Sequence, residues 1–356
     1  MKIEEIKLQN FRSFKDKTVN FSPGTTVILG DNARGKTNLF EAIYLLSSGK
    51  SFHAERDTEM LRWGTDFARV SGDISEGEEK VTLEIVLTGG LLDGQKVPLK
   101  KYMVNDVTKR SVDFTGNFKA VLFWPEDLEL IVRSPVVRRR YLDFVLSGVD
   151  REYRRSLGSY ERGIRQRNKI LQCINEGRAS AIQLTFWNQL VIKTGNFITS
   201  KREEFIDFVN KRKSPFKDFS FRTVYDPSLI NESRLEQYKN EEIRAMVTLV
   251  GPHRDDFGIE ALEPGAGEDI RFRDIAHFGS RGEQRLAVLW LKLGELDFVK
   301  FVSACKPVLL LDDILSELDH PHREIVFEII KNQQTIISTT DTHFLSEQNF
   351  ENITRL

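Results

Sequence analysis

The alternation of apolar and polar residues predicts β-strands in the first part of the chain. Between residues 81 and 87 the odd-numbered positions are all aliphatic, which is the two-residue period of a half-buried antiparallel strand. The runs IEEIKLQNF at 3–11, TTVIL at 25–29 and KYMVNDV at 101–107 have a similar texture. We therefore expect a region rich in short strands and tight turns up to about residue 125.

After residue 125 the apolar residues follow a helical period instead. The apolar stripe of residues 151–174 consists of Tyr153, Leu157, Tyr160, Ile164 and Leu171. Spacings of three, four and seven residues place these side chains on one face of a helix. Similar patterns predict further helices at 186–209 and 283–299.

Strand-like texture returns at 246–260 and in the apolar run PVLLLDD at 307–313. The chain thus reads as an α/β body interrupted by a helical segment. We expect residues 1–125 and 246–356 to form the body and residues 126–245 to form a helical insert domain.

Composition excludes several classes of protein. The chain has 356 residues, of which 40% are hydrophobic and 29% charged, as in ordinary globular proteins. No apolar run approaches the ~18 residues of a membrane span, and the first residues lack a secretory pattern, so a cytoplasmic location is expected. Cys173 and Cys305 are too far apart for a paired zinc motif, and the net charge of −1 gives no global sign of nucleic-acid binding.

A complete phosphate-binding loop follows the strand at 25–29. It matches G-x-x-x-x-G-K-[ST] with a strand before it and a helical pattern after it. Its expected nucleotide-binding residues are Gly30, Asp31, Asn32, Ala33, Arg34, Gly35, Lys36, Thr37 and Asn38. Lys36 is expected to reach the β- and γ-phosphates and to act in catalysis, and the Thr37 hydroxyl is expected to hold Mg²⁺. The loop indicates a nucleotide but not its use.

Two carboxylates end the apolar strand at 308–311. In open α/β sheets ligands lie at the carboxyl ends of strands, so Asp312 is the expected Mg²⁺-side residue. Asp313 is predicted to alternate to the opposite side, where it would orient or deprotonate the attacking water. A simple role for Asp313 in ending the strand remains the alternative.

A second anion-ready helix start precedes the helix at 283–299. Ser280 and Glu283 have the spacing of a capping box. A capping box does not require Gly282, whose missing side chain would open the helix N-terminus to an anion. One chain with two such starts suggests that the second serves the nucleotide of another subunit.

Basic residues are concentrated between residues 133 and 169, which hold eleven Lys and Arg against four acidic residues. At 100° per residue, one arc of the predicted helix carries Arg151, Arg154, Arg155, Arg162, Arg165 and Lys169. This face could simply be solvated, but its single sign favours binding to the phosphate backbone of DNA. The neighbouring Arg138, Arg139 and Arg140 are assigned to DNA binding or to a dimer interface, without a way to separate the two.

The motifs resemble those of ABC-type ATPases. Ser280, Gly282, Glu283 and Gln284 resemble their signature motif, Asp312–Asp313 their acidic strand end, and residues 316–319 the D-loop that touches the partner subunit. Within that superfamily, the segments 6–14, 30–38, 123–143, 251–257 and 309–319 together resemble the RecF family of bacterial DNA repair proteins. The match runs in order from about residue 1 to residue 340.

The resemblance implies the head of an SMC-like ABC-type ATPase, with a mixed sheet core, an antiparallel β subdomain and a compact helical insert. It implies ATP and Mg²⁺ as cofactors and an ATP-dependent homodimer in which the P-loop of one copy faces Ser280 of the other. It also implies a weak, DNA-stimulated ATPase that acts as a switch on gapped DNA and helps load RecA with RecR and RecO in replication, repair and the SOS response.

Two positions depart from the ABC pattern. The transporter-type switch histidine is replaced by the stretch at 338–341, where Thr340 or the later His343 is the nearest candidate for contact with the γ-phosphate. No glutamine stands at the Q-loop, where Glu126 or Asp127 would have to serve.

The ATPase subunit of a membrane transporter is the alternative function, but it does not explain the basic insert helix. Metal binding by His253, Asp255 and Asp256 is disfavoured because a strand would point them to opposite faces.

Overall fold

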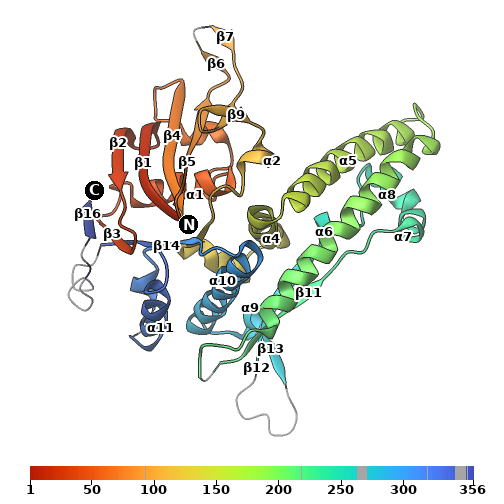
Figure 1. The fold of residues 1–356 in the computed structure, drawn as a ribbon. Coiled ribbons are helices and arrows are strands. Elements are labelled where there is room, and N and C mark those ends of the chain that lie inside the picture. Colours follow the sequence, from red (N-terminus) through yellow and green to blue (C-terminus); the bar gives the residue numbers. More distant parts are fainter. Residues whose placement is uncertain (93, 218, 263–270, 319, 341–349, 351) are drawn as a thin grey trace. The chain divides into compact units, whose positions relative to one another are not determined.

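The computed structural model describes the chain except residues 93, 218, 263–270, 319, 341–349 and 351 (Figure 1). The described chain divides into two compact units. Unit 1 consists of Met1–Asp127 and Glu295–Leu356, and unit 2 of Leu128–Gly294. The first junction lies close to the boundary expected at 125, whereas the second lies well beyond 245. The predicted domain boundaries stay a prediction, because compact units and family domains need not coincide.

An antiparallel sheet of six strands forms one part of unit 1. In spatial order its strands are β2 (Phe14–Asn20), β1 (Lys2–Phe11), β4 (Phe67–Glu76), β5 (Glu79–Thr88), β8 (Lys100–Val104) and β9 (Val107–Lys109). The predicted strand at 81–87 lies within β5, and its odd-numbered residues 83–87 are buried. The expected strand at 101–107 is instead two strands joined at Asn105 and Asp106, whose φ angles of 47° and 63° suit a tight hairpin turn.

The second sheet of unit 1 is parallel and carries the P-loop strand. Its order is β10 (Ala120–Phe123), β14 (Val308–Asp312), β15 (Thr335–Thr339), β3 (Thr25–Leu29) and β16 (Asn352–Arg355). The helix α1 (Lys36–Ser48) contacts strands of both sheets, and its Leu39, Phe40 and Ile43 are fully buried in their shared core. The packing leaves no spare room, since a Cβ on Gly72 of β4 would lie 2.6 Å from Leu46 Cδ1.

Short elements complete unit 1 within the described residues. They are η1 (Asp57–Met60), the hairpin of β6 (Leu91–Leu92) and β7 (Gln95–Lys96), α2 (Ser111–Phe114), η5 (Ile314–Glu317) and α11 (His320–Ile330). The short η2 (Pro125–Leu128) spans the junction with unit 2. Figure 1 shows the β6–β7 hairpin extending away from the antiparallel sheet.

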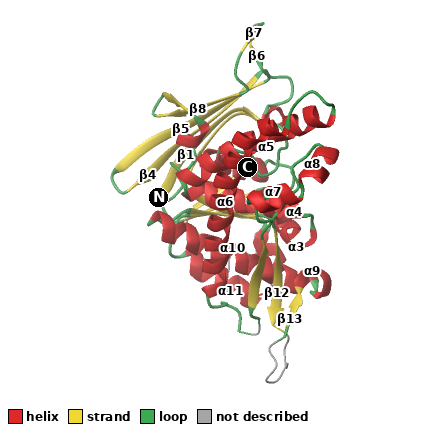
Figure 2. Cartoon of the chain, turned by 90° about the vertical axis from the view of Figure 1, so that its right-hand side faces the viewer, coloured by secondary structure: helices red, strands yellow, loops and turns green. Residues whose placement is uncertain are grey.

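Unit 2 is built on a long antiparallel pair of helices, α5 (Arg151–Asn175) and α6 (Thr185–Lys211) (Figure 1). Around them lie α3 (Glu129–Val132), α4 (Pro135–Val149), η3 (Ala181–Leu184), α7 (Glu232–Gln237), α8 (Lys239–Ala245), η4 (Pro252–Arg254) and α9 (Ile275–Phe278). Figure 2 shows part of the small antiparallel sheet of β11 (Phe221–Asp226), β12 (Asp256–Leu262) and β13 (Phe272–Asp274). The helix α10 (Arg281–Ser303) begins in unit 2 and continues into unit 1.

The helices expected at 151–174, 186–209 and 283–299 are confirmed as α5, α6 and α10. The strand expected from residue 246 is wrong at its start. Met246 ends α8 in a left-handed conformation with φ of 56°, residues 252–254 form η4, and the strand begins only at Asp256. Among the described residues, no helix combines the length and the apolarity that crossing a membrane requires.

A buried charge network holds the segment 252–255 against α4, α5 and α6. Arg202 of α6 donates to Asp143 at 2.8 Å, to Asp255 at 2.8 Å and to the Pro252 carbonyl at 2.7 Å. The other Asp255 oxygen accepts from the Ser228 N–H at 2.7 Å. Because buried charges are stable only when paired, this network accounts for Asp255 without a metal.

Candidate nucleotide-binding site

The P-loop places the Lys36 ammonium inside its own arch. Lys36 Nζ donates to the carbonyl of Gly30 at 2.6 Å and to that of Asp31 at 3.1 Å. Residues 31–34 are exposed, and Gly35 and Lys36 are buried at the base. The helix α1 begins at Lys36, so the positive end of its dipole points toward the same arch. A phosphate group in this position would meet an ammonium group, backbone N–H groups and a helix start.

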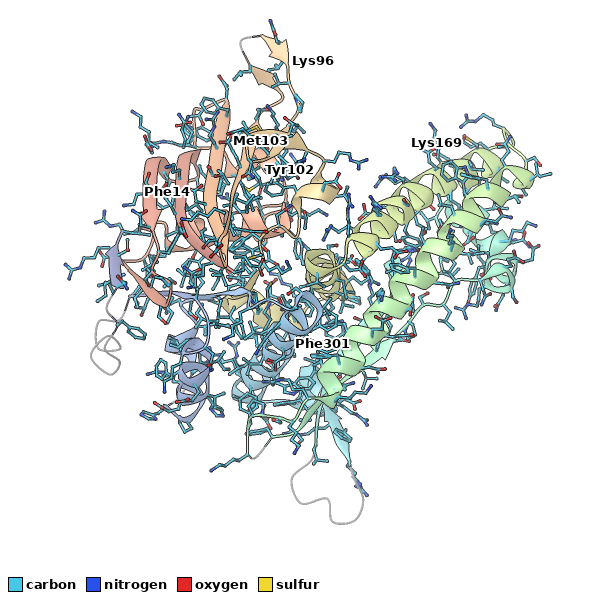
Figure 3. The ribbon with its side chains drawn as sticks, viewed as in Figure 1. Phe14, Lys96, Tyr102, Met103, Lys169 and Phe301 are labelled. Carbon is cyan, nitrogen blue, oxygen red and sulfur yellow. The ribbon has the colours of Figure 1, made fainter. Side chains whose placement is uncertain are left out.

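Glycine is required at position 35, at the turn into α1, for two reasons. Its φ of 98° lies in the region that glycine favours. A Cβ there would also lie 2.7 Å from Ser13 Oγ and 2.9 Å from the Phe14 ring. Ser13 Oγ accepts a hydrogen bond from Asn38 Nδ2 at 3.0 Å. The turn between β1 and β2, which leads into Phe14 (labelled in Figure 3), therefore fixes the base of the P-loop.

Asp312 and Thr37 are brought together as the predicted Mg²⁺ pair. Asp312 is buried at the end of β14 and accepts a hydrogen bond from Ser338 Oγ at 2.5 Å. Burial raises the pKa of Asp312, against the opposing effect of hydrogen bonds from Ser338 and Thr37. The strand β15 lies between β14 and the P-loop strand β3, so the Ser338 hydrogen bond ties the end of β14 to the strand that pairs with β3. A carboxylate and a hydroxyl are the hard oxygen ligands that Mg²⁺ prefers, and the pair fits that ion.

Asp313 does not continue the strand alternation that the sequence predicted. Its φ of 53° is left-handed, and its backbone N–H donates to Ser338 Oγ at 3.0 Å. The chain then enters η5, for which Asp313 is the N-cap residue. Its proposed role toward the attacking water stays a prediction.

An ion pair beside the P-loop, between the half-buried Arg12 and the buried Glu41, was not predicted from the sequence. The Arg12 guanidinium makes two contacts to Glu41 of α1, at 2.7 and 2.8 Å, and Arg12 Nη1 donates to the Glu59 carbonyl at 2.7 Å. Glu41 is almost fully buried and also accepts from Ser51 Oγ at 2.5 Å. Glu41 lies one turn after Thr37, so Arg12 positions the helix that begins at the P-loop. The sequence contained a signal for this ion pair, because an acidic residue within the apolar run LFEAI (39–43) needs a buried partner.

The signature segment in unit 2 forms the capping box that its spacing predicts. The Ser280 N–H donates to Glu283 Oε2 at 2.8 Å, and the Glu283 N–H donates to Ser280 Oγ at 3.3 Å. Burial tends to raise the pKa of Glu283, but the hydrogen bonds from Ser280 and the ion pair with Arg273 lower it overall. Glu283 is therefore a structural carboxylate that stays charged.

The signature residues differ in accessibility. Ser280 and Gly282 are exposed, whereas Gln284 is buried and donates from Nε2 to the Ile275 carbonyl at 3.2 Å. A Cβ on Gly282 would meet only Ser280 Oγ, at 4.0 Å, so the fold of the chain does not require glycine there. The missing side chain instead leaves the first turn of α10 open to a ligand.

The candidate sensor residues are less defined. Thr340 is exposed just after β15, and His343 and Asp319 lie outside the described residues. Asp127 is buried and accepts a hydrogen bond from the Trp124 N–H at 3.0 Å, while Glu126 is exposed. Glu126 is thus the more accessible of the two Q-loop candidates.

The basic residues predicted to bind DNA fall into two groups. An exposed stripe on α5 consists of five of them, Arg151, Arg155, Arg162, Arg165 and Lys169. Figure 3 labels Lys169. On the opposite face, Tyr153 and Tyr160 are buried as expected. The half-buried Arg154 donates to the Ser147 carbonyl instead.

The arginines of α4 are engaged within unit 2. Arg138 forms two contacts with Asp256, at 2.6 and 2.9 Å. Arg139 donates to the Asp255 carbonyl at 2.7 Å, and burial lowers the pKa of Arg139. Arg140 is exposed and lies over the Phe144 ring at 5.2 Å. Of these three, Arg140 is the best placed to meet another molecule.

Comparison with known proteins places these motifs in one family. Residues 2–355 match the model of the RecF/RecN/SMC N terminal domain. The DNA replication and repair protein RecF of Acetivibrio thermocellus is 35% identical over 98% of this chain and 96% of its own length. That of Herpetosiphon aurantiacus is 34% identical over 100% of this chain and 97% of its own length.

Solved structures agree with the sequence comparison. The structure of the recombination mediator protein RecF with ATP superposes with a TM-score of 0.87 at 30% identity, covering 99% of this chain and 95% of that one. An SMC head bound to a domain of ScpA shares the fold, with a TM-score of 0.52 at 20% identity, covering 99% of this chain and 93% of that one. The resemblance and the ABC-type ATPase head fold expected from the sequence are confirmed. The chain therefore belongs to the RecF family of DNA replication and repair proteins, within the RecF/RecN/SMC N-terminal domain family.

Proposed function

We propose that this chain is an ATP-operated clamp on DNA, in which ATP joins two copies and slow, DNA-stimulated hydrolysis lets them part. The observation that carries the proposal is the presence of two anion-ready helix starts in one chain, at Lys36 of α1 and at Ser280 of α10. The ATP-bound structures of RecF relatives support ATP as the nucleotide. The RecFOR pathway named for those structures supports RecR and RecO as partners in loading RecA.

In each copy, the residues around the P-loop bind and orient ATP. Lys36 moves from the carbonyls of Gly30 and Asp31 to the β- and γ-phosphates, which are stronger acceptors. Thr37 and Asp312 hold Mg²⁺, which neutralises phosphate charge when bound. Asp313, tied to Ser338 through its backbone, orients the attacking water.

The second copy completes the site through its signature segment. The exposed Ser280 hydroxyl and the first turn of α10 meet the γ-phosphate, because Gly282 leaves space for a close approach. Thr340 is the proposed sensor of that phosphate in the copy that binds it. Loss of the γ-phosphate removes the shared contact, so the dimer dissociates after hydrolysis.

The stripe on α5 binds the DNA backbone. Its five exposed cations form one face of a helix, while the other face packs in the core of unit 2. Contacts of this kind recognise phosphates without reading bases, so duplex DNA at a gap is bound by shape and charge.

Sedimentation velocity tests the proposal directly. The chain is compared without nucleotide, with ADP, with ATP and with ATP plus a gapped duplex. We expect a monomer in the first two conditions, a dimer with ATP and a faster complex with DNA. Lys36→Met should abolish ATP binding and the dimer together, and a Lys36→Met dimer that still depends on ATP would refute the P-loop assignment.

A second variant tests the assignment of Ser280. Ser280→Arg places a bulky side chain at the open first turn of α10, so it should block the ATP-dependent dimer while the monomer still binds ATP. Loss of ATP binding by the monomer would show instead that Ser280 acts within its own chain.

A further inference from the structure

Exposed apolar residues on three contacting elements form a candidate patch beside the signature segment. It consists of Phe278, Val136 and Val132, whose exposed fractions are 71%, 61% and 56%. These residues belong to α9, α4 and α3 of unit 2, and α3 contacts both α4 and α9. Single exposed apolar residues are ordinary on a protein surface. Because the elements that carry these three residues contact one another, the three residues are treated as one apolar patch, and a patch of this kind needs a reason.

The backbone at Phe278 is fixed by its neighbours, and its side chain is exposed. Arg273 Nη1 donates to the Phe278 carbonyl at 2.7 Å, and the same guanidinium pairs with Glu283. The following Gly279 is essential, because a Cβ there would lie 2.6 Å from the Ile275 carbonyl oxygen. The backbone at Phe278 is thus held by Arg273, which also pairs with the Glu283 that caps the signature helix. A backbone fixed before binding reduces the entropy that is lost when a partner covers this segment.

The surroundings of the patch have the layout of a protein interface. Charged groups border the apolar centre: Glu129 pairs with Arg133 at 2.7 Å, His277 lies 2.6 Å from Asp274, and Arg281 is exposed. An apolar centre with a charged border is the usual anatomy of such interfaces, and aromatic residues are their typical anchors.

We infer that this patch docks a second copy of this chain in the ATP-bound dimer, with Phe278 as the anchor. The inference rests on the proposed function, in which Ser280 meets the nucleotide of the partner. Phe278 is two residues from Ser280, a distance of at most ~7 Å along the chain. The surface that surrounds the P-loop of the partner must therefore approach Phe278 whenever Ser280 meets the γ-phosphate. DNA is a poorer occupant, because its phosphates would meet an apolar ring.

Truncation of the anchor tests the inference. Phe278→Ala should weaken ATP-dependent dimerisation at least tenfold in sedimentation velocity, and Phe278→Ala with Val136→Ser should weaken it further. Binding of ATP to the monomer should be unchanged, and Phe278→Leu should restore much of the dimer. The matched control is Phe301→Ala, because Phe301 is 73% exposed and lies near the other end of α10 (Figure 3), ~30 Å along the helix. This control should dimerise like the parent chain.

The outcomes separate this inference from the function on which it rests. A parent chain that stays monomeric with ATP would overturn both. A parent chain that dimerises, together with a Phe278→Ala variant that dimerises equally well, would overturn the patch alone. A variant with normal dimerisation but weaker binding to gapped DNA without nucleotide would assign the patch to DNA and also overturn the inference.

Discussion

At the scale of single residues, a buried carboxylate beside the P-loop is stabilised by one arginine. Glu41 is buried in an apolar helix, and the Arg12 guanidinium compensates it with two contacts. The pair joins the β1–β2 turn to α1, and that turn also contacts Gly35. Stability and the shape of the phosphate-binding arch are thus linked through one arginine.

We predict that Arg12→Ala destabilises unit 1 by about 3 kcal/mol, because it leaves Glu41 buried without its main partner. Arg12→Ala with Glu41→Gln should be less destabilised than Arg12→Ala alone, since the unpaired charge is then removed. Urea unfolding measures both, with the exposed Lys15→Ala as the control from the same hairpin. Equal stability of Arg12→Ala and Lys15→Ala would show that the ion pair contributes nothing.

At the scale of elements, helices and strands with a regular apolar period could be predicted from the sequence. Segments whose conformation depends on residues distant in the sequence could not. The 3.6-residue stripe of α5 survives in the structure because one face of that helix packs against the core. The segment 246–255 was misread because its conformation depends on Arg202, which is remote in sequence and anchors Pro252 and Asp255. The P-loop could be read from local spacing, whereas the approach of Asp312 to Thr37 depends on the order of the strands in the parallel sheet.

The contact between α5 and η4 gives unit 2 a predictable pH dependence. His253 Nε2 lies 3.0 Å from the Thr248 carbonyl, so it donates there, and Nδ1 accepts from the Tyr160 hydroxyl at 2.7 Å. Burial lowers the pKa of His253, and the nearby Arg254 and Arg139 lower it further against the effects of Thr248 and Asp255. The neutral imidazole is therefore the form that fits this site.

We predict that unit 2 loses stability as the pH falls below about 6.5, the ordinary pKa of histidine. The unfolded chain then binds a proton that folded His253 resists, so the free energy of unfolding decreases by at most about 1.4 kcal/mol per pH unit. His253→Gln should show a shallower decrease between pH 7 and pH 5.5 in urea unfolding. The exposed His277→Asn serves as control, and an identical slope for the parent chain and His253→Gln would contradict the prediction.

At the scale of the whole molecule, the residues proposed to hold ATP within one copy and those proposed to bind DNA belong to different units. The P-loop, Asp312 and Ser338 belong to unit 1, and the signature segment and the α5 stripe belong to unit 2. A charge change on the stripe should therefore alter DNA binding without disturbing the residues that bind ATP. The structure also refines which arginines to change, because Arg154 donates to the Ser147 carbonyl and is expected to matter for folding.

We predict that replacing Arg155, Arg162 and Arg165 by Glu lowers the affinity for gapped duplex DNA, while ATPase activity without DNA is retained. Each phosphate contact that is lost should reduce the slope of log K against log salt by about 0.9, so three contacts should reduce it by about 3. Fluorescence anisotropy over a salt series measures the slope. The control has the same net charge change at exposed lysines of unit 1, Lys300, Lys306 and Lys331. If both triple variants lose affinity equally, net charge rather than the α5 stripe governs binding, and a stripe variant with an unchanged slope would place the DNA elsewhere.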